Sequence, residues 1–394
     1  MVHEQSRRFG ENRNYIRELS AFGNARAAVI GKENVLDFSI GNPSVPAPPQ
    51  IEAAIRQILS DTDSLAIHSY TSATGDPETK AAIARNLSRR FGLTVTPEEL
   101  FIGCGSASEL TAVFRALAFD GAQILAIAPY FPEYMPFVSQ SGATFRVVPP
   151  DIPDFQIRFD ALEDMLCAET CAVILNCPNN PAGTVYTAQT LRRLSDLLTR
   201  KAEQYGHPIY LVSDEPYREL TYDGVTAPFI PLYYRDTIVC YSYSKSFSLP
   251  GERIGYIYVP KTLTDFTDVF HAIRGAARAM GHICAPTLWQ KVIARCADVT
   301  PDFTVYEENR KLLYEGLQSA GYTVAKPEGA FYLFVQSPDG DGRAFAERAK
   351  QRDLLIVPGD DFGCPSYVRI CYCVPREKIE KSLPVFRDLI KSSK

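Results

Sequence analysis

The chain has 394 residues, of which 46% are hydrophobic and 22% are charged, as in an ordinary globular protein. Its formal net charge is −5 and its basic residues are scattered, which argues against nucleic acid or an anionic membrane surface as a partner. No apolar run approaches the roughly 20 residues that span a bilayer, and the polar N-terminus lacks the apolar core of a secretory signal. A chain of this length usually exceeds one hydrophobic core, so we expect two domains in a cytoplasmic protein.

The sequence contains ten cysteines and five histidines. No CxxC pair occurs and the histidines are far apart, so we expect no metal site. Most of the cysteines lie in or beside apolar, strand-like runs. We interpret them as small buried side chains in a reducing compartment rather than as a disulfide framework.

Short apolar runs alternate with helical patterns from about residue 98 to residue 260. They are continuous rather than alternating in polarity, as expected for strands covered on both faces. Strand–helix–strand repetition predicts an α/β domain with a mostly parallel sheet flanked by helices. The runs are AQILAIAP (122–129), CAVILNCP (171–178), IYLVSDEP (209–216), TIVCYSYS (237–244) and IGYIYVP (254–260).

The C-terminal third has a different pattern. Helical periodicity over about 305–319, 342–352 and 376–391 is mixed with the short strands AFYLFV, LLIVPG and YVRICYC. This mixture predicts a smaller α+β domain, with a boundary near 280–295.

Ligands of parallel α/β sheets bind at the carboxyl ends of the strands, so we expect the functional residues to lie there. Gly105 and Ser106 form a tight turn into a helix, whose free N–H groups suit an anion such as phosphate. Neither GxGxxG nor a Walker motif is present. Phe131 follows the next strand, where an aromatic side chain either stacks on a flat ring or simply packs.

Two further strand ends carry polar groups. NCPNNPAG places Asn180 in a proline-rich turn, where its amide either completes the turn or binds a ligand oxygen. IYLVSDEPY ends in Asp214, Glu215 and Tyr217. Two carboxylates that finish a buried strand are costly unless they are paired, so we expect a cation nearby.

The stretch YSYSKSFSLPGERIGY places Lys245 at the end of another apolar run. Desolvation lowers the pKa of a buried lysine and favours the neutral amine, which attacks carbonyl groups. Ser242 and Ser244 supply hydroxyls, and Arg253 offers a planar fork for phosphate or carboxylate. A buried ion pair with Asp214 is the alternative explanation of Lys245.

An anion cradle, a flat aromatic ring, an amide, a carboxylate and an imine-forming lysine together suit pyridoxal 5′-phosphate. At this point the sequence resembles the class I/II aminotransferases, which are fold-type-I pyridoxal-phosphate enzymes. The resemblance extends over about three-quarters of the chain, with its motifs in the order of that family. These motifs are YxxxxG (70–75), NxPNNPxG (176–183), SDExY (213–217), SxSKx₅GxRxG (242–255), PEGAFY (327–332) and VRICYC (368–373).

The resemblance implies a role for each matching residue at the cofactor. Lys245 would form the internal aldimine and shuttle the proton, while Asp214 would hold the pyridinium nitrogen. Asn180 and Tyr217 would bind the 3′-oxygen, and Phe131 would stack on the ring. The phosphate would lie in a cup formed by Gly105, Ser106, Ala107, Ser242, Ser244 and Arg253.

The resemblance also implies how substrate and subunits are arranged. Arg369 would bind the substrate α-carboxylate, joined by Asn180 and the backbone at Gly41. Tyr70 would reach the phosphate of a neighbouring subunit, which implies a homodimer with shared active sites. The large domain would comprise 49–285, and 1–48 would join 286–394 in a small domain that closes over substrate.

The implied reaction moves an amino group between an L-amino acid and a 2-oxo acid by a ping-pong mechanism. Aspartate is a possible donor, within a broader range. Ala107 stands where one bacterial aspartate aminotransferase subgroup has a lysine for the distal carboxylate, and Arg274 or Arg278 is an alternative cation. The other readings are a pyridoxal-phosphate-dependent β-lyase or aminocyclopropane-carboxylate-synthase-like enzyme and, remotely, a non-catalytic regulator.

Overall fold

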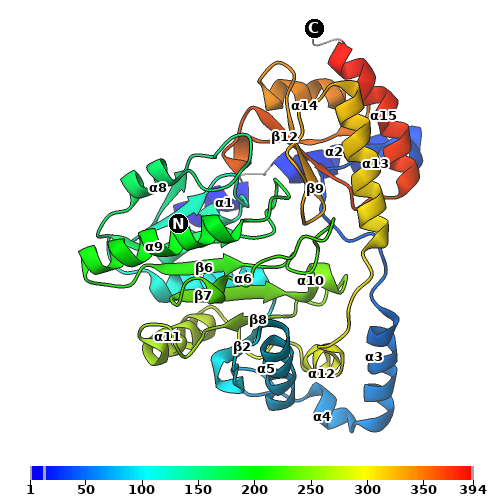
Figure 1. Cartoon of the computed structure of the whole chain (residues 1–394). Coiled ribbons are helices and arrows are strands. Elements are labelled where there is room, and N and C mark those ends of the chain that lie inside the picture. Colours follow the sequence, from blue (N-terminus) through cyan, green and yellow to red (C-terminus); the bar gives the residue numbers. More distant parts are fainter. Residues whose placement is uncertain (1, 12–14, 392–394) are drawn as a thin grey trace.

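The computed structural model describes residues 2–11 and 15–391. Its centre is a seven-stranded sheet with the order β2-β8-β7-β6-β5-β3-β4 (Figure 1). All of its pairings are parallel except those of β8, which is antiparallel to both neighbours. The strands are β2 (Leu100–Gly103), β3 (Gln123–Ile127), β4 (Thr144–Val148), β5 (Thr170–Asn176), β6 (Tyr210–Asp214), β7 (Thr237–Ser242) and β8 (Gly255–Tyr258).

The predicted α/β architecture is therefore confirmed, and burial explains why the apolar runs are continuous. Every residue of β2, β3, β5, β6, β7 and β8 is buried. Strands with helices on both faces need apolar side chains at every position. The edge strand β4 is the exception. Its first four residues alternate between exposed and half-buried positions, and only Val148 is buried.

Helices cover both faces of the sheet and surround the second, smaller part of the chain (Figure 1). Apolar residues of α6 and α11 share one core with one face of the sheet, and those of α8 and α9 share another core with the opposite face. The helices that belong to 49–296 are α3 (Pro49–Asp61), α4 (Ser64–His68), α5 (Pro77–Phe91), α6 (Ser106–Leu117), α7 (Tyr134–Ser141), α8 (Phe159–Met165), α9 (Ala188–Tyr205), α10 (Tyr243–Ser246), α11 (Phe266–Ala279) and α12 (Thr287–Cys296), with 3-10 turns η2 (Pro97–Glu99) and η3 (Ile230–Leu232).

The C-terminal part forms a separate three-stranded sheet with the order β11-β12-β9. The N-terminal strand β1 pairs with β10, so both ends of the chain contribute to this region. The elements here are α1 (Glu4–Glu11), α2 (Tyr15–Ile30), β1 (Leu36–Asp37), α13 (Thr304–Ala320), β9 (Tyr332–Gln336), α14 (Gly342–Lys350), β10 (Leu354–Leu355), β11 (Val357–Pro358), β12 (Tyr367–Cys371) and α15 (Arg376–Lys391), with 3-10 turns η1 (Lys32–Asn34) and η4 (Asp360–Phe362).

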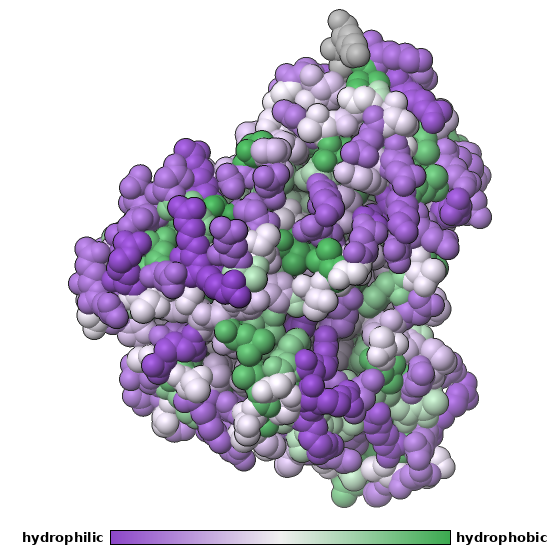
Figure 2. All heavy atoms as spheres, in the orientation of Figure 1, coloured by the Kyte–Doolittle hydropathy of each residue, from purple (hydrophilic) through white to green (hydrophobic). Residues whose placement is uncertain are grey.

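Figure 2 shows hydrophilic residues over most of one face, with apolar residues gathered near the middle, between the upper and lower parts of the view. Within residues 2–11 and 15–391, no helix is both long enough and apolar enough to cross a membrane.

Candidate functional site

The sheet brings the polar strand ends predicted from the sequence to one edge. Asn176 pairs with Asp214 across β5 and β6, and Asp214 pairs with Cys240 across β6 and β7. Ser242 pairs with Gly255 at the end of β7. Parallel strands end together, so residues that are far apart in sequence lie at one site.

Lys245 lies on α10, the single helical turn that follows β7, rather than on the strand itself. Its Nζ atom donates a hydrogen bond of 2.7 Å to the carbonyl of Gly41. The ion pair with Asp214 considered above is not formed between these two described residues. Burial lowers the pKa of Lys245. The neighbouring Cys373 and Cys371 oppose this shift, whereas the positive charges of Arg369 and Arg253 add to it, so Lys245 loses its proton more easily than an exposed lysine.

Asp214 is a buried carboxyl with one satisfied oxygen. The hydroxyl of Tyr134 donates to Oδ2 at 2.6 Å, whereas Oδ1 is buried and has no hydrogen-bond partner among the residues that the structure describes. The cation expected near these two acids is Arg218, which forms an ion pair of 2.6 Å with the neighbouring Glu215. Burial raises the pKa of Asp214 to about 7, although the bond from Tyr134 opposes this shift. Asp214 is therefore ready to accept a cationic or N–H partner.

The turn before α6 forms a cradle with Arg253. Gly105 has φ 86, and a Cβ atom there would lie 2.7 Å from Nη2 of Arg253, so only glycine lets the guanidinium approach this closely. Ser242 and Ser244 share a hydrogen bond of 2.6 Å, and Nη1 of Arg253 lies 3.5 Å from Oγ of Ser244. The first N–H groups of the helix, two hydroxyls and a guanidinium are thus arranged for an anion.

A second cluster surrounds Arg369 on β12. Its Nη1 donates to Oδ1 of Asn180 at 3.0 Å and its Nη2 to the Ser39 carbonyl at 2.6 Å, whereas buried Nε has no partner. The ring of Tyr332 lies under the guanidinium, with Cζ 4.6 Å from the ring centroid. The hydroxyls of Tyr332 and Tyr217 are 3.0 Å apart, which joins this cluster to the strand-end residues.

Three other predicted residues make weaker or no contacts with these clusters. Phe131 is partly buried and meets the ring of Tyr134 edge-on at 5.6 Å. Ala107 lies in the first turn of α6 and contributes only backbone groups to the cradle. Tyr70 is 93% exposed. Arg274 and Arg278 are also exposed, on the outer side of α11.

Sequence reasoning missed three buried residues at this site. Tyr134 binds Asp214, and its only sequence signal is its place shortly after a strand end. Tyr332 is the last residue of the motif PEGAFY, but the sequence indicated no role for it. Glu109 is buried with both carboxyl oxygens unpartnered, and burial together with the charge of Asp214 raises its pKa well above the usual range.

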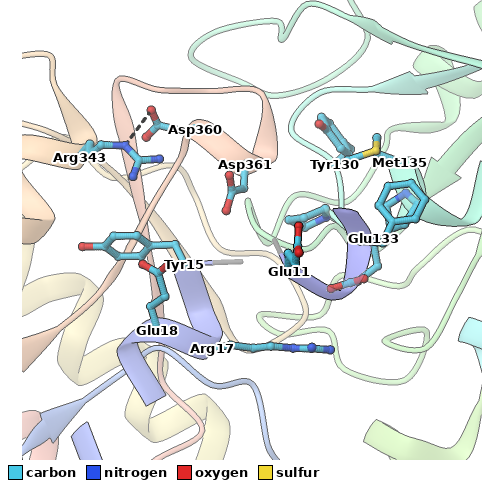
Figure 3. A pocket seen from close by; sticks show the side chains of 13 residues that line it. Glu11, Tyr15, Arg17, Glu18, Tyr130, Glu133, Met135, Arg343, Asp360 and Asp361 are labelled. Atoms are coloured by element: carbon cyan, nitrogen blue, oxygen red, sulfur yellow. Dashed lines mark hydrogen bonds and ion pairs between the residues drawn. The ribbon is translucent and has the colours of Figure 1, made fainter. Parts of the chain in front are cut away.

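A cavity of about 710 Å³ lies beside this site rather than at Lys245 (Figure 3). It lies between the N-terminal helices, the segment that follows β3 and the turn η4. Tyr130 on its wall donates its backbone N–H to the carbonyl of Phe362, whose ring lies 5.0 Å from the Arg369 guanidinium. Its charged lining is mostly acidic: Glu11, Glu18, Glu133, Asp360 and Asp361, with Arg17 and Arg343.

We predict that Asp214→Asn stabilises the ligand-free protein at alkaline pH. Because the folded-state pKa of Asp214 is about 7, above the usual 3.8, its contribution to stability falls as pH rises between these values. Asparagine does not titrate and still accepts the Tyr134 bond. The variant is expected to exceed the wild type by about 4 kcal/mol near pH 8 and to match it near pH 4, as measured by urea unfolding.

The exposed Asp196 on α9 provides the matched control, since Asp196→Asn changes the same atoms in water and should leave stability almost unchanged. A stability gain from Asp214→Asn that is the same at both pH values would show that burial of the charge is not its cause.

Known proteins that are similar to this chain are aminotransferases. Residues 33–385 match the family model for aminotransferase class I and II. The chain is 30% identical to a probable aspartate/prephenate aminotransferase of Thermus aquaticus, over 93% of this chain and 95% of that protein.

Solved structures show the same similarity. An aminotransferase from Eubacterium rectale is 51% identical with a TM-score of 0.98, over 100% of this chain and 99% of that one. The Thermus thermophilus aspartate aminotransferase solved with maleate is 26% identical with a TM-score of 0.84, over 99% of this chain and 100% of that one. The family match spans most of the chain, and the chain belongs to the class I and II aminotransferases.

Proposed function

We propose that this aminotransferase uses pyridoxal 5′-phosphate, held between Lys245, Asp214 and the Gly105–Arg253 cradle. The observation that carries the proposal is the unpartnered Oδ1 of buried Asp214. An unpaired carboxylate is expensive in such a place, and a protonated pyridine nitrogen would supply the missing N–H.

The remaining residues fit the other parts of the cofactor. The cradle suits its phosphate, with Ser106, Ala107, Ser242 and Ser244 beside the guanidinium of Arg253. Tyr217 and Asn180 lie between Asp214 and Arg369, where they are suited to the 3′-oxygen. Phe131 is the aromatic side chain available to cover the ring. When bound, pyridoxal phosphate supplies an electrophilic carbon and a conjugated ring that accepts electrons from the substrate.

The residues of this chain would bind substrate and move its proton. The guanidinium of Arg369, which packs against the ring of Tyr332, would bind the α-carboxylate. Neutral Lys245 is the base for the α-proton, and the Gly41 carbonyl holds its amine in place. Since Gly41 lies against the Tyr332 hydroxyl, no larger residue fits at this position.

We propose aspartate as one amino donor, with further L-amino acids accepted and a 2-oxo acid as the acceptor. The names of the relatives from Thermus support a dicarboxylate. Ala107 provides no cation for a distal carboxylate, so that group would need another one. Arg274 and Arg278 are candidates from a partner subunit, because in this chain they lie on the surface.

We further propose a cytoplasmic homodimer with shared sites. Tyr70 is a large side chain that remains 93% exposed in a single chain, as expected if its contacts are on a neighbour. Residues 49–285 would form the large cofactor domain, and 1–48 with 286–394 the domain that closes over substrate.

A donor screen with 2-oxoglutarate tests the reaction. Amino acids of each side-chain class are incubated with the enzyme, and glutamate, pyruvate and ammonia are measured. Transfer to glutamate with aspartate among the active donors is expected. Release of ammonia and pyruvate without glutamate would identify a lyase instead.

Borohydride reduction tests the role of Lys245. Reduction is expected to fix the cofactor to the tryptic peptide that carries Lys245, as seen by mass spectrometry. Lys245→Ala is expected to bind cofactor without covalent attachment and to lose measurable turnover. Labelling of Lys80 or any other lysine would refute the assignment.

Arg369→Lys tests carboxylate binding. Lysine keeps the charge but loses the two-pronged geometry, so kcat/KM is expected to fall about a hundredfold, mainly through KM. The loss should be similar for aspartate and for neutral donors, since all of them share the α-carboxylate. A loss confined to one donor would assign Arg369 to side-chain recognition.

A further inference from the structure

Two cysteines lie next to each other at the substrate end of the proposed site. The Sγ atoms of Cys371 and Cys373 are 2.9 Å apart, closer than an ordinary contact between two sulfur atoms. Both residues are buried, and Cys373 retains 3% exposure. The other cysteines of the described residues are also free thiols, and no second pair of sulfurs there lies within hydrogen-bonding distance.

The pair lies where β12 meets the N-terminal segment 38–42. The backbone N–H of Cys371 donates to the Phe38 carbonyl at 3.0 Å, and the Cys373 thiol donates to the Asn42 carbonyl at 3.1 Å. Between these contacts, the Gly41 carbonyl accepts the bond from Lys245. A change at the two sulfurs therefore acts directly on the segment that holds Lys245.

The surroundings of the pair favour one thiolate. Burial raises the pKa of the Cys371 thiol, but the contact with Cys373 and the nearby Arg369 and Lys245 outweigh it and lower that pKa overall. Burial and the neighbouring Cys371 sulfur raise the pKa of Cys373. Cys371 is thus the more acidic of the two thiols and the one that forms the attacking thiolate more easily.

The geometry points to a modification site: we propose that Cys371 and Cys373 form a dithiol that small hydroperoxides convert reversibly to a disulfide. The Cys371 thiol first releases its proton to solvent, and its thiolate attacks one peroxide oxygen. The O–O bond breaks, Cys371 becomes a sulfenic acid, and the departing hydroxide takes up a proton to form the first water. Cys373 then attacks that sulfur, the S–O bond breaks, and its proton leaves with the hydroxide as water. In sum, hydrogen peroxide takes two electrons from the two thiols and becomes two waters.

The disulfide weakens substrate binding. Forming the bond draws the Cys373 sulfur away from the Asn42 carbonyl and removes the negative charge beside Lys245 and Arg369. Segment 38–42 then loses its hydrogen bond from Cys373. The other sulfur of the pair, at Cys371, is two residues from Arg369, whose guanidinium binds the α-carboxylate. The cofactor contacts at Asp214 and Gly105 lie on other elements and are unaffected. A bond that closes so short a loop stabilises the chain little, so dithiols reduce it readily.

Hydrogen peroxide on the intact holoenzyme tests the modification. After free thiols are alkylated, mass spectrometry is expected to show loss of two hydrogen atoms, mapped to the peptide with Cys371 and Cys373, and their return with dithiothreitol. Cys373→Ser should gain oxygen at Cys371 instead of forming the bond. Cys171→Ala removes a buried strand cysteine outside the pair and should form the disulfide as the wild type does. A disulfide mapped elsewhere, or none, overturns the proposal.

Arsenite gives a measurement on the unaltered protein. One arsenic is expected per chain, with two As–S bonds formed and two waters released, and it should block later oxidation. The absence of bound arsenic would show that the sulfurs cannot act together.

The effect on substrate rests on the proposed function and is measured separately. Oxidised enzyme is expected to show a KM for amino donors raised about tenfold, with the cofactor absorbance unchanged. An unchanged KM would refute this consequence. The mass and arsenic measurements would remain valid even for a protein that transfers no amino group.

Discussion

Burial of the Asp214 carboxyl without a cation is the constraint on which the site depends. The fold can pair a buried acid, because it does so one residue later, where Glu215 is bound by Arg218. Asp214 receives only the Tyr134 hydroxyl, which is too weak a donor to overcome burial. The rest of the sheet must offset the free-energy cost of burying this carboxyl group. Binding of a ligand with an N–H group would remove that cost by supplying the missing hydrogen bond.

The central sheet can offset that free-energy cost because all of its strands except β4 are buried along their whole length. Packing on both faces fixes β5, β6 and β7, and parallel pairing makes them end together. The chemistry then lies just beyond the strands, on short turns that cannot move far. Lys245 shows this arrangement: one helical turn separates it from β7, and a single backbone carbonyl fixes its amine.

The sequence was sufficient to predict the architecture, and it named most of the residues that we propose for the cofactor. Continuous apolar runs predicted the parallel sheet, and Gly105, Asp214, Lys245 and Arg253 each stood at a strand end where their chemistry was unusual. Tyr134 and Glu109 were not predictable in this way. Their importance comes from three-dimensional neighbours, since a tyrosine or glutamate within a helix has the same local pattern whether or not it faces a buried carboxylate.

The substrate half is harder to predict because no single element builds it. Segment 38–42, Asn180, Tyr332 and the stretch 369–373 come from four distant parts of the chain. Tyr332 pairs with Cys371 across β9 and β12, whereas Asn180 and segment 38–42 are held to the stretch 369–373 by hydrogen bonds. Each contact there depends on a different neighbour, so a change in one residue alters how the others are held. Cys371 and Cys373 lie in this half, where a sulfur pair would influence substrate binding without disturbing the cradle or Asp214.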